Sequence, residues 1–259
     1  MKNLFFGLLA VGIYSLTSCT DFSSGEFSDN SSGGAQSGSY TSMVTIGSKL
    51  YTVSKEDLST VDISDPAKPK LIDRQHVGFM IENLYHTSGI LFIGSQSAMH
   101  IYAINSKGVP EKKSSTPYIN FGTDVLPCDP VISDGSFAYA TLSSSFDAAC
   151  GRSVFINELR TYNVKDLSNP ILVTTNQMQN PKGLALSNDK LYICEPNFGL
   201  SIFNVNDRSL PQPEQTIHDC NCFDVIVKDQ LILAVGKNEI FQFAIGPNHV
   251  ITKLQTIKI

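Results

Sequence analysis

The segment LSTVDISDPAKPKLI, residues 58–72, decides the fold of this chain. It begins with an apolar run, breaks at Asp65-Pro66, passes a second proline at Pro69 and then resumes an apolar run. Related segments are MHIYAINSKGVPEKK at 99–113, LRTYNVKDLSNPILV at 159–173 and LSIFNVNDRSLPQPEQ at 200–215. A pattern that returns at regular spacing predicts a fold built from stacked copies of one unit.

Five copies can be aligned at a spacing close to forty residues. The third strand expected in each copy starts with one apolar residue, at Leu58, Met99, Leu159, Leu200 and Ile240. A second apolar position lies upstream, at Tyr51, Phe92, Tyr139, Tyr192 and Ile232. In the fourth copy we predict four short strands, at residues 183–187, 190–194, 200–205 and 213–217. Asn188-Asp189 is a hairpin signal between the first two.

Both faces of the third strand are apolar in most copies. In the first copy Leu58 lies on one face, and Val61 and Ile63 lie on the other. A sheet with one wet face would instead alternate between apolar and polar residues. Four-stranded sheets that are covered on both faces and repeat in this way are typical of a β-propeller. The sequence therefore predicts an all-β fold, a five-bladed β-propeller of four-stranded antiparallel blades over residues 40–259, in which the neighbouring blades cover each blade around a closed ring.

The Asp-Pro phrase has a structural explanation. Asp65, Asp166 and Asp207 each follow the third strand, where an Asp side chain can accept a backbone N–H in a turn. The later prolines open the fourth, outer strand, where a missing N–H discourages pairing with another chain. These prolines are Pro69, Pro110, Pro170 and Pro211.

The repeats LSTVDISDPAKPKL, LRTYNVKDLSNPIL and LSIFNVND resemble the LVIVD repeat, a propeller repeat of exported bacterial proteins. CDPVISDGSFAYATL at 128–142 and NPKGLALSNDKLYIC at 180–194 are similar to lipoprotein members of that family from Bacteroidetes-type genomes. The resemblance covers about residues 40–259, and the second and fifth copies lack Asp-Pro. It implies a propeller but no chemistry, because the family is largely of unknown function.

The start of the chain predicts export. Lys2 precedes the apolar residues 4–16, a run too short to span a bilayer and typical of a signal peptide. Leu16-Thr17-Ser18-Cys19 resembles a bacterial lipobox, which implies cleavage of residues 1–18 and lipidation of Cys19. An ordinary secretory signal is the alternative. The Ser- and Gly-rich residues that follow Cys19, up to residue 39, predict a flexible tether.

These features predict where the protein is located in the cell and which class of partner it binds. A lipid on Cys19, such as palmitate, would anchor the chain in the cell envelope, at the outer membrane or the cell surface. The formal net charge of −5 opposes binding to nucleic acid. We expect a monomer that contacts the membrane through its lipid and binds an envelope protein or glycan, without a cofactor.

Six cysteines are present, and lipidation of Cys19 leaves an odd number. Cys128 and Cys150 flank the same blade, and we predict a disulfide between them because export permits one. Cys194 is expected near Cys220 and Cys222, and either of these could bridge to it. A zinc site formed by Cys194, His218, Cys220 and Cys222 is the alternative, but Cys-x-Cys is a poor match to zinc spacing.

No catalytic motif is found in the sequence. A ligand site is expected at the mouth of the propeller channel, where first strands begin. The candidate residues there are Glu82, Asn83, Asp129, Lys182, Glu195, His218 and Asp224. The leading hypothesis is a non-enzymatic binding or scaffold module at the envelope. The alternatives are a hydrolase or lyase that acts on an envelope polysaccharide or peptide through these carboxylates, and a purely structural surface protein.

Overall fold

The computed structural model describes residues 40–118, 130–143 and 156–259, all within one compact unit, Gly33–Ile259. The predicted signal, Cys19 and the tether lie outside the described residues, as do Cys128, Asp129 and Cys150. The described residues form five antiparallel sheets of four strands, each a simple meander in chain order, so the predicted all-β fold is confirmed. No described helix is long and apolar enough to cross a membrane.

The strands group into sheets in the order of the chain. Sheets 1 and 2 comprise β1 (Met43–Ile46), β2 (Lys49–Val53), β3 (Asp57–Asp62), β4 (Lys70–His76), and β5 (Ile81–Thr87), β6 (Ile90–Ser95), β7 (Ala98–Ile104), β8 (Pro110–Pro117). Sheet 3 comprises β9 (Val131–Ser133), β10 (Phe137–Ser143), β11 (Asn157–Asn163) and β12 (Ile171–Gln177). Sheets 4 and 5 comprise β13 (Leu184–Ser187), β14 (Lys190–Glu195), β15 (Gly199–Asn204), β16 (Gln212–Ile217), and β17 (Asp224–Lys228), β18 (Leu231–Val235), β19 (Glu239–Ile245), β20 (Ile251–Lys258), with a 3₁₀ turn, η1 (Pro247–His249), between the last two.

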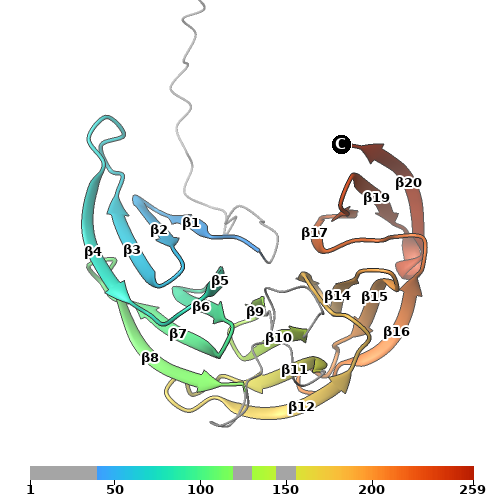
Figure 1. Cartoon of the computed structure of the whole chain (residues 1–259), viewed down its shortest axis with the longest axis horizontal. Coiled ribbons are helices and arrows are strands. Elements are labelled where there is room, and N and C mark those ends of the chain that lie inside the picture. Colours follow the sequence, from blue (N-terminus) through green and yellow to red (C-terminus); the bar gives the residue numbers. More distant parts are fainter. Residues whose placement is uncertain (1–39, 119–129, 144–155) are drawn as a thin grey trace, which may run out of the picture. The chain divides into compact units, whose positions relative to one another are not determined.

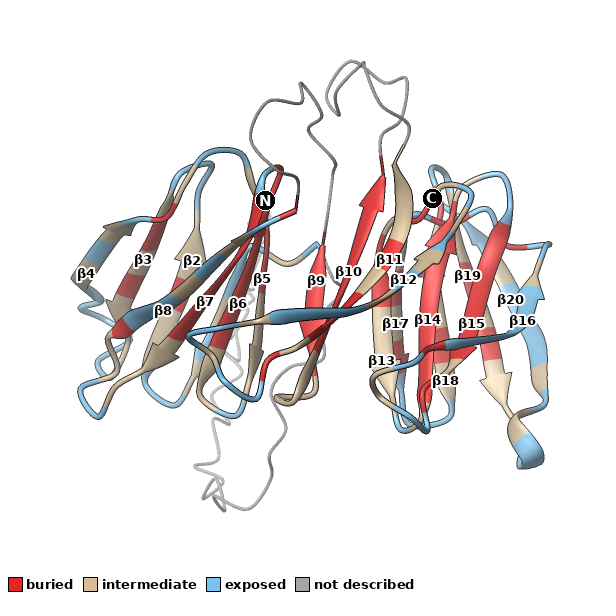
Figure 2. Cartoon of the chain, turned by 90° about the horizontal axis from the view of Figure 1, so that it is seen from below, coloured by how far each residue is buried: buried red, intermediate tan, exposed pale blue. Residues whose placement is uncertain are grey.

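The sheets follow one another with their first strands on the inside and their fourth strands on the outer rim (Figure 1). First strands of consecutive sheets contact one another, as β5 contacts β9 and β13 contacts β17. The inner strands carry most of the buried residues, whereas the outer strands are largely exposed (Figure 2). This is the arrangement of a β-propeller.

Four buried apolar clusters hold consecutive sheets together. They join sheet 1 to sheet 2, sheet 2 to sheet 3, sheet 3 to sheet 4 and sheet 4 to sheet 5. We call the face turned to the next sheet the forward face and the opposite one the backward face. Leu58, Leu159 and Leu200 lie on forward faces, whereas Tyr102 and Tyr162 lie on backward faces. The two apolar faces predicted for the third strand are thus confirmed.

The described residues show no fifth interface of this kind. No buried apolar cluster of theirs joins sheet 5 to sheet 1, so the predicted coverage is confirmed for the faces between consecutive sheets and stays a prediction for the forward face of sheet 5 and the backward face of sheet 1. The sequence pattern could not reveal this, because the two end sheets carry the same alternation of residues as the inner ones.

One alignment position is also corrected. The sequence aligns Ile232 with Tyr192. In the structure, Tyr192 pairs with Ile202 on the neighbouring strand. The residue forty positions after Ile202 is Gln242, and it pairs with Leu233 rather than with Ile232. Leu233 is therefore the equivalent of Tyr192. A slip of one residue in a strand moves a side chain to the other face, and Ile232 accordingly packs backward, on sheet 4.

The residues of the Asp-Pro motif form the turns predicted for them. The side chains of Asp65, Asp166 and Asp207 accept backbone N–H groups of Ala67, Ser168 and Ser209 at 3.0, 3.0 and 2.9 Å. The outer strands begin at or directly after the predicted prolines. Each outer strand also contains one bulged residue, which disturbs a free edge that could otherwise recruit another strand. The bulged residues are Ile72, Lys113, Val173, Glu214 and Leu254.

Candidate functional site

The predicted channel-mouth residues lie near the starts of the first strands or in the loops beside them, but several have structural contacts that occupy their polar atoms. Asn83 is fully buried at the boundary of sheets 2 and 3. Its Nδ2 donates to the carbonyl of Val131 at 2.9 Å, and its Oδ1 accepts the N–H of Gly94 at 2.9 Å. Asn83 therefore joins two sheets, and its side chain is not offered to a ligand.

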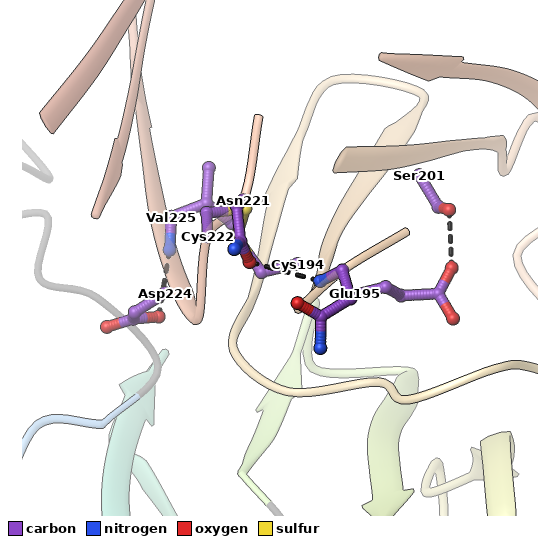
Figure 3. Close-up of a disulfide and its surroundings, with 8 residues drawn as sticks. Cys194, Glu195, Ser201, Asn221, Cys222, Asp224 and Val225 are labelled. Carbon is purple, nitrogen blue, oxygen red and sulfur yellow. Dashed lines mark hydrogen bonds between the residues drawn. A yellow bond between two sulfur atoms is a disulfide. The ribbon is translucent and has the colours of Figure 1, made fainter. Parts of the chain in front are cut away.

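Glu195 is a buried carboxylate at the end of β14. Its Oε1 accepts the N–H groups of Gln179 and Asn180 at 2.8 and 3.2 Å, and its Oε2 accepts the Ser201 hydroxyl at 2.6 Å. Three donors satisfy this buried charge and fix the loop that leads into β13. Figure 3 shows Glu195 turned toward Ser201 while the carboxylate of Asp224 points to the opposite side. The two acids do not form a pair.

Asp224 starts β17 at a very close approach between sheets 4 and 5. Its Oδ1 accepts the N–H of Val225 at 2.9 Å. The N–H of Gly183 donates to the Phe223 carbonyl at 2.8 Å. A Cβ on Gly183 would lie 2.2 Å from Asp224 Oδ1 and 2.7 Å from its Cα, so only glycine allows the first strands to come this close.

The remaining described candidates are His218, Lys182 and Glu82. His218 is exposed, with Nδ1 3.0 Å from the Phe198 carbonyl, and lines a shallow hollow on the outer side of sheet 4. Lys182 and Glu82 are half-buried and have partners. The carbonyl of Lys182 accepts the hydroxyl of Thr141 at 2.6 Å, which ties sheet 3 to sheet 4.

A disulfide joins Cys194, on β14, to Cys222, just before β17 (Figure 3). It covalently links sheets 4 and 5, and it resolves which of the two nearby cysteines bridges to Cys194. Cys220 is a buried free thiol whose pKa burial raises to about 12. With two sulfurs bonded to each other, Cys194 and Cys222 are not thiolate ligands, and no group of metal-ligating side chains is found in the described part of the chain.

A polar pocket lies elsewhere, between the turns of sheets 4 and 5 at the other end of their strands. It encloses about 150 Å³, and all but two of its lining residues, Ile245 and Gly246, are polar. The other lining residues are Ser187, Asn188, Asp189, Lys190, Tyr192, Asp229, Gln230 and His249. The space is polar and large enough for several waters or one small polar ligand.

The pocket arises where the repeat departs from its own pattern. Tyr51 donates its hydroxyl to the Gly108 carbonyl in the next sheet, and the equivalent Tyr139 donates to the Arg208 carbonyl, each at 2.9 Å. The third equivalent, Tyr192, instead meets the imidazole of His249, with Oη 3.0 Å from Nε2. A titratable side chain thus replaces a backbone carbonyl at this one boundary.

Among the described residues, the one lysine that lines the pocket, Lys190, is held by two carboxylates. Lys190 is buried, with Nζ 2.6 Å from Glu214 Oε2 and 3.7 Å from Asp189 Oδ2. Burial, followed by the charge of Lys190, lowers the pKa of His249, and burial raises the pKa of Tyr192. The dyad of Tyr192 and His249 is therefore neutral at pH 7.

Three residues that line the pocket have positive φ angles: Asn188 (53°), Asp229 (54°) and His249 (60°). Asn188 and Asp229 take this conformation as the first residues of two-residue hairpin turns, which favour it. His249 lies outside such a hairpin, in the connection between β19 and β20. The sequence could have suggested His249 only as a departure from the repeat, because GPNHV at 246–250 stands where the other copies carry Asp-Pro or a similar turn.

Comparisons with known proteins bear on the fold. No family model and no curated protein matches the chain, so the LVIVD resemblance stays a prediction. Several solved structures are similar. A protein from Lactobacillus plantarum superposes with a TM-score of 0.63 at 12% identity, covering 82% of this chain and 69% of that one.

A functionally unknown protein from Desulfotomaculum acetoxidans gives a TM-score of 0.65 at 10% identity, over 83% of this chain and 69% of the other. The periplasmic gluconolactonase of Pseudomonas aeruginosa gives a TM-score of 0.60 at 12% identity, over 82% and 68%. At these identities the likeness concerns the fold alone. Each of these proteins contains about a third of its chain beyond the matched part.

Proposed function

We propose that this chain is an exported, lipid-anchored β-propeller that acts as a binding module at the bacterial cell envelope. The ligand is a small hydroxyl-rich molecule, such as one sugar unit of an envelope glycan, and it occupies the pocket beside Tyr192 and His249. The observation that carries the proposal is the replacement of a structural carbonyl by His249, because it creates a polar pocket at one sheet boundary.

The chemistry of the pocket selects among ligand classes. Asp189 and Asp229 line it, and Glu214 lies behind Lys190, so negative charge exceeds positive charge and anions such as phosphate are disfavoured. A neutral polyol can exchange hydrogen bonds with the hydroxyl of Tyr192 and with the amide of Gln230. In ligand pockets generally, a small number of placed polar groups fix the orientation of the ligand and provide specificity.

Thermal unfolding with a panel of neutral sugars, amines and anions tests the binding site. A bound sugar is expected to raise Tm in a concentration-dependent manner. Tyr192→Phe and His249→Ala are expected to abolish the shift. Tyr51→Phe is the matched control, because it removes an equivalent hydroxyl at a boundary where the acceptor is the backbone carbonyl of Gly108. The proposal fails if no sugar shifts Tm or if Tyr192→Phe responds like the parent chain.

The anchor is tested separately. Labelling of expressing cells with a palmitate analogue is expected to mark the parent chain, and Cys19→Ser is expected to lose both the label and the membrane association. Cys220→Ser removes a different cysteine and should keep both. A soluble, unlabelled parent chain would overturn the lipid anchor while leaving the sugar site intact.

The alternative function, a hydrolase or lyase at the channel mouth, receives less support. Glu195 is saturated by three donors, and its carboxylate points away from that of Asp224 (Figure 3). General acid–base chemistry needs carboxyl groups placed about one substrate bond. The gluconolactonase shares the fold, and folds host unrelated functions.

A further inference from the structure

Two sheet faces, the forward face of sheet 5 and the backward face of sheet 1, are not covered by a neighbouring sheet among the described residues. On sheet 5, alternate residues of β17, β18 and β19 pack backward on sheet 4 and are fully buried. The residues between them point forward and are only half-buried. Six of these forward residues are apolar: Ile226, Leu231, Leu233, Val235, Ile240 and Ala244. Three polar residues also point forward: Gln242, which pairs with Leu233, and Asp224 and Lys228 at the two ends of β17, where Lys228 is exposed.

Forward faces in the other sheets show what such residues normally do. On sheet 4, Tyr192, Cys194, Leu200 and Ile202 point forward and are each no more than 1% exposed, because sheet 5 covers them. The same positions on sheet 5 lack a covering sheet among the described residues. A largely apolar face without a covering sheet is typical of an interaction site.

Sheet 1 presents the complementary half. Its backward face carries Leu50 and Val61, which are half-buried, together with Met43 and Leu71, which are 57% and 55% exposed. Thr45, Thr52 and Ser59 also lie on this face, and its outer border carries Arg74, which donates to the carboxylate of Asp57 at 2.6 Å, and His76. In sheet 2 the same backward position is filled by Leu91 and Ile93, which sheet 1 buries completely.

We propose that sheet 5 of one copy packs its forward face on the backward face of sheet 1 of a second copy. The chain contains four interfaces between consecutive sheets, and in all four a forward face meets a backward face. The two open faces are one of each kind. Only a contact between sheet 5 and sheet 1 therefore continues an interface that the chain already uses.

The partner is another copy because the chain's own sheet 1 does not fulfil this role in the described structure. A head-to-tail contact is heterologous, so copies add on until a ring closes or a filament forms. This proposal replaces the monomer expected from the sequence and is independent of the sugar site.

Sedimentation of the full-length chain in detergent, over a range of concentrations, tests the proposal with two blocking variants. Leu233→Glu places a charge on the forward face of sheet 5, and Leu50→Glu places one on the backward face of sheet 1. The parent chain is expected to associate beyond a monomer, and each variant alone is expected to be monomeric. Leu172→Glu is the control, because Leu172 is 46% exposed on β12, away from both faces.

Mixing the two variants gives the decisive result. Each retains the half that the other lacks, so a mixture is expected to form a dimer of one copy of each and nothing larger. Dimers of Leu50→Glu alone would instead show that two sheet 5 faces pair, and a monomeric parent chain would show that no copy binds. Either result overturns the proposal.

Folding is checked by circular dichroism and Tm before sedimentation. If either variant unfolds, Ala244→Arg and Thr45→Glu block the same two faces at half-buried and exposed positions. The mixture of these two variants must give the same dimer.

Discussion

Tyr192 and His249 come from different sheets, and their Oη and Nε2 atoms lie 3.0 Å apart. The contact is the counterpart of the hydrogen bonds that Tyr51 and Tyr139 donate to backbone carbonyls of the following sheet. A buried tyrosine hydroxyl thus reaches across three of the four boundaries between consecutive sheets, whereas Phe92 occupies the equivalent position at the boundary of sheets 2 and 3. At one boundary the acceptor has become a side chain, and a pocket lies beside it.

Removing the hydroxyl of Tyr51 or of Tyr192 is expected to lower stability by a similar amount, whereas only the change at Tyr192 is expected to affect sugar binding. Tyr51→Phe and Tyr192→Phe each remove one hydrogen bond between sheets, and each is expected to lower the free energy of unfolding by about 1 kcal/mol. Urea titration measures the loss. A much smaller effect for Tyr192→Phe would show that the contact with His249 contributes no stability.

The disulfide of Cys194 and Cys222 spans a sequence separation of 28 residues. For a closed loop of this length, constraint of the unfolded chain contributes about 3–4 kcal/mol. The double variant Cys194→Ser with Cys222→Ser is therefore expected to lose about that much, as measured by denaturant unfolding. Cys220→Ser, at a buried unbonded thiol, is the control and should lose less.

A thiol count checks the pairing independently. In the Cys220→Ser variant, a reagent that reacts with free thiols after unfolding should find one thiol fewer than in the parent chain. If the count instead rises by one, Cys220 is the bridging residue and the assignment to Cys222 is wrong.

Much of the fold could be predicted because it follows from local sequence patterns. The apolar faces of residues such as Leu58 and Tyr102 follow from strand alternation, and Asp65 with Pro69 sets the turn and the outer strand. The misplaced Ile232 shows the limit of this reasoning. A strand of five apolar or small residues, LILAV, offers no polar residue that fixes the face on which each side chain lies.

The candidate site was harder to predict, because burial decides whether a polar residue is free. Asn83 and Glu195 are residue types that often bind ligands, yet here their side chains hold loops and sheets together. The sequence places Lys190 and Tyr192 in the repeat, but it does not show that His249, 57 residues beyond Tyr192, meets it. Such a contact depends on how two sheets pack, which no local pattern encodes.

Gly183 offers a test of the close approach between β13 and β17. Gly183→Ala would place Cβ 2.2 Å from Asp224 Oδ1 and 2.7 Å from its Cα, so the two first strands must separate. We expect a loss of about 3 kcal/mol or more, or failure to fold. Gly135→Ala is the control, because its Cβ meets no atom within 4 Å and only the positive φ of 94° is strained, which costs about 1 kcal/mol. Equal losses would contradict the packing argument.

His100 predicts how stability depends on pH. The ring is 4% exposed, with Nδ1 2.9 Å from the Ser115 hydroxyl and Nε2 3.3 Å from that of Ser95. Burial, with a smaller contribution from the charge of Lys112, lowers its pKa from 6.5 to about 4. Since the unfolded chain takes up this proton at higher pH, the contribution is fully present above pH 6.5 and is lost as pH falls toward 4.

The free energy of unfolding is therefore expected to fall by up to about 3 kcal/mol more in the parent chain than in His100→Gln between pH 6.5 and 4. Glutamine keeps a polar side chain at this position and does not titrate, so the difference between the two profiles isolates the histidine from the carboxylates that both proteins share. His218→Gln, at an exposed site, is expected to follow the parent chain. Parallel profiles for the parent chain and His100→Gln would mean that the folded protein accommodates the charged ring between Ser95 and Ser115, contrary to the cost of burying it.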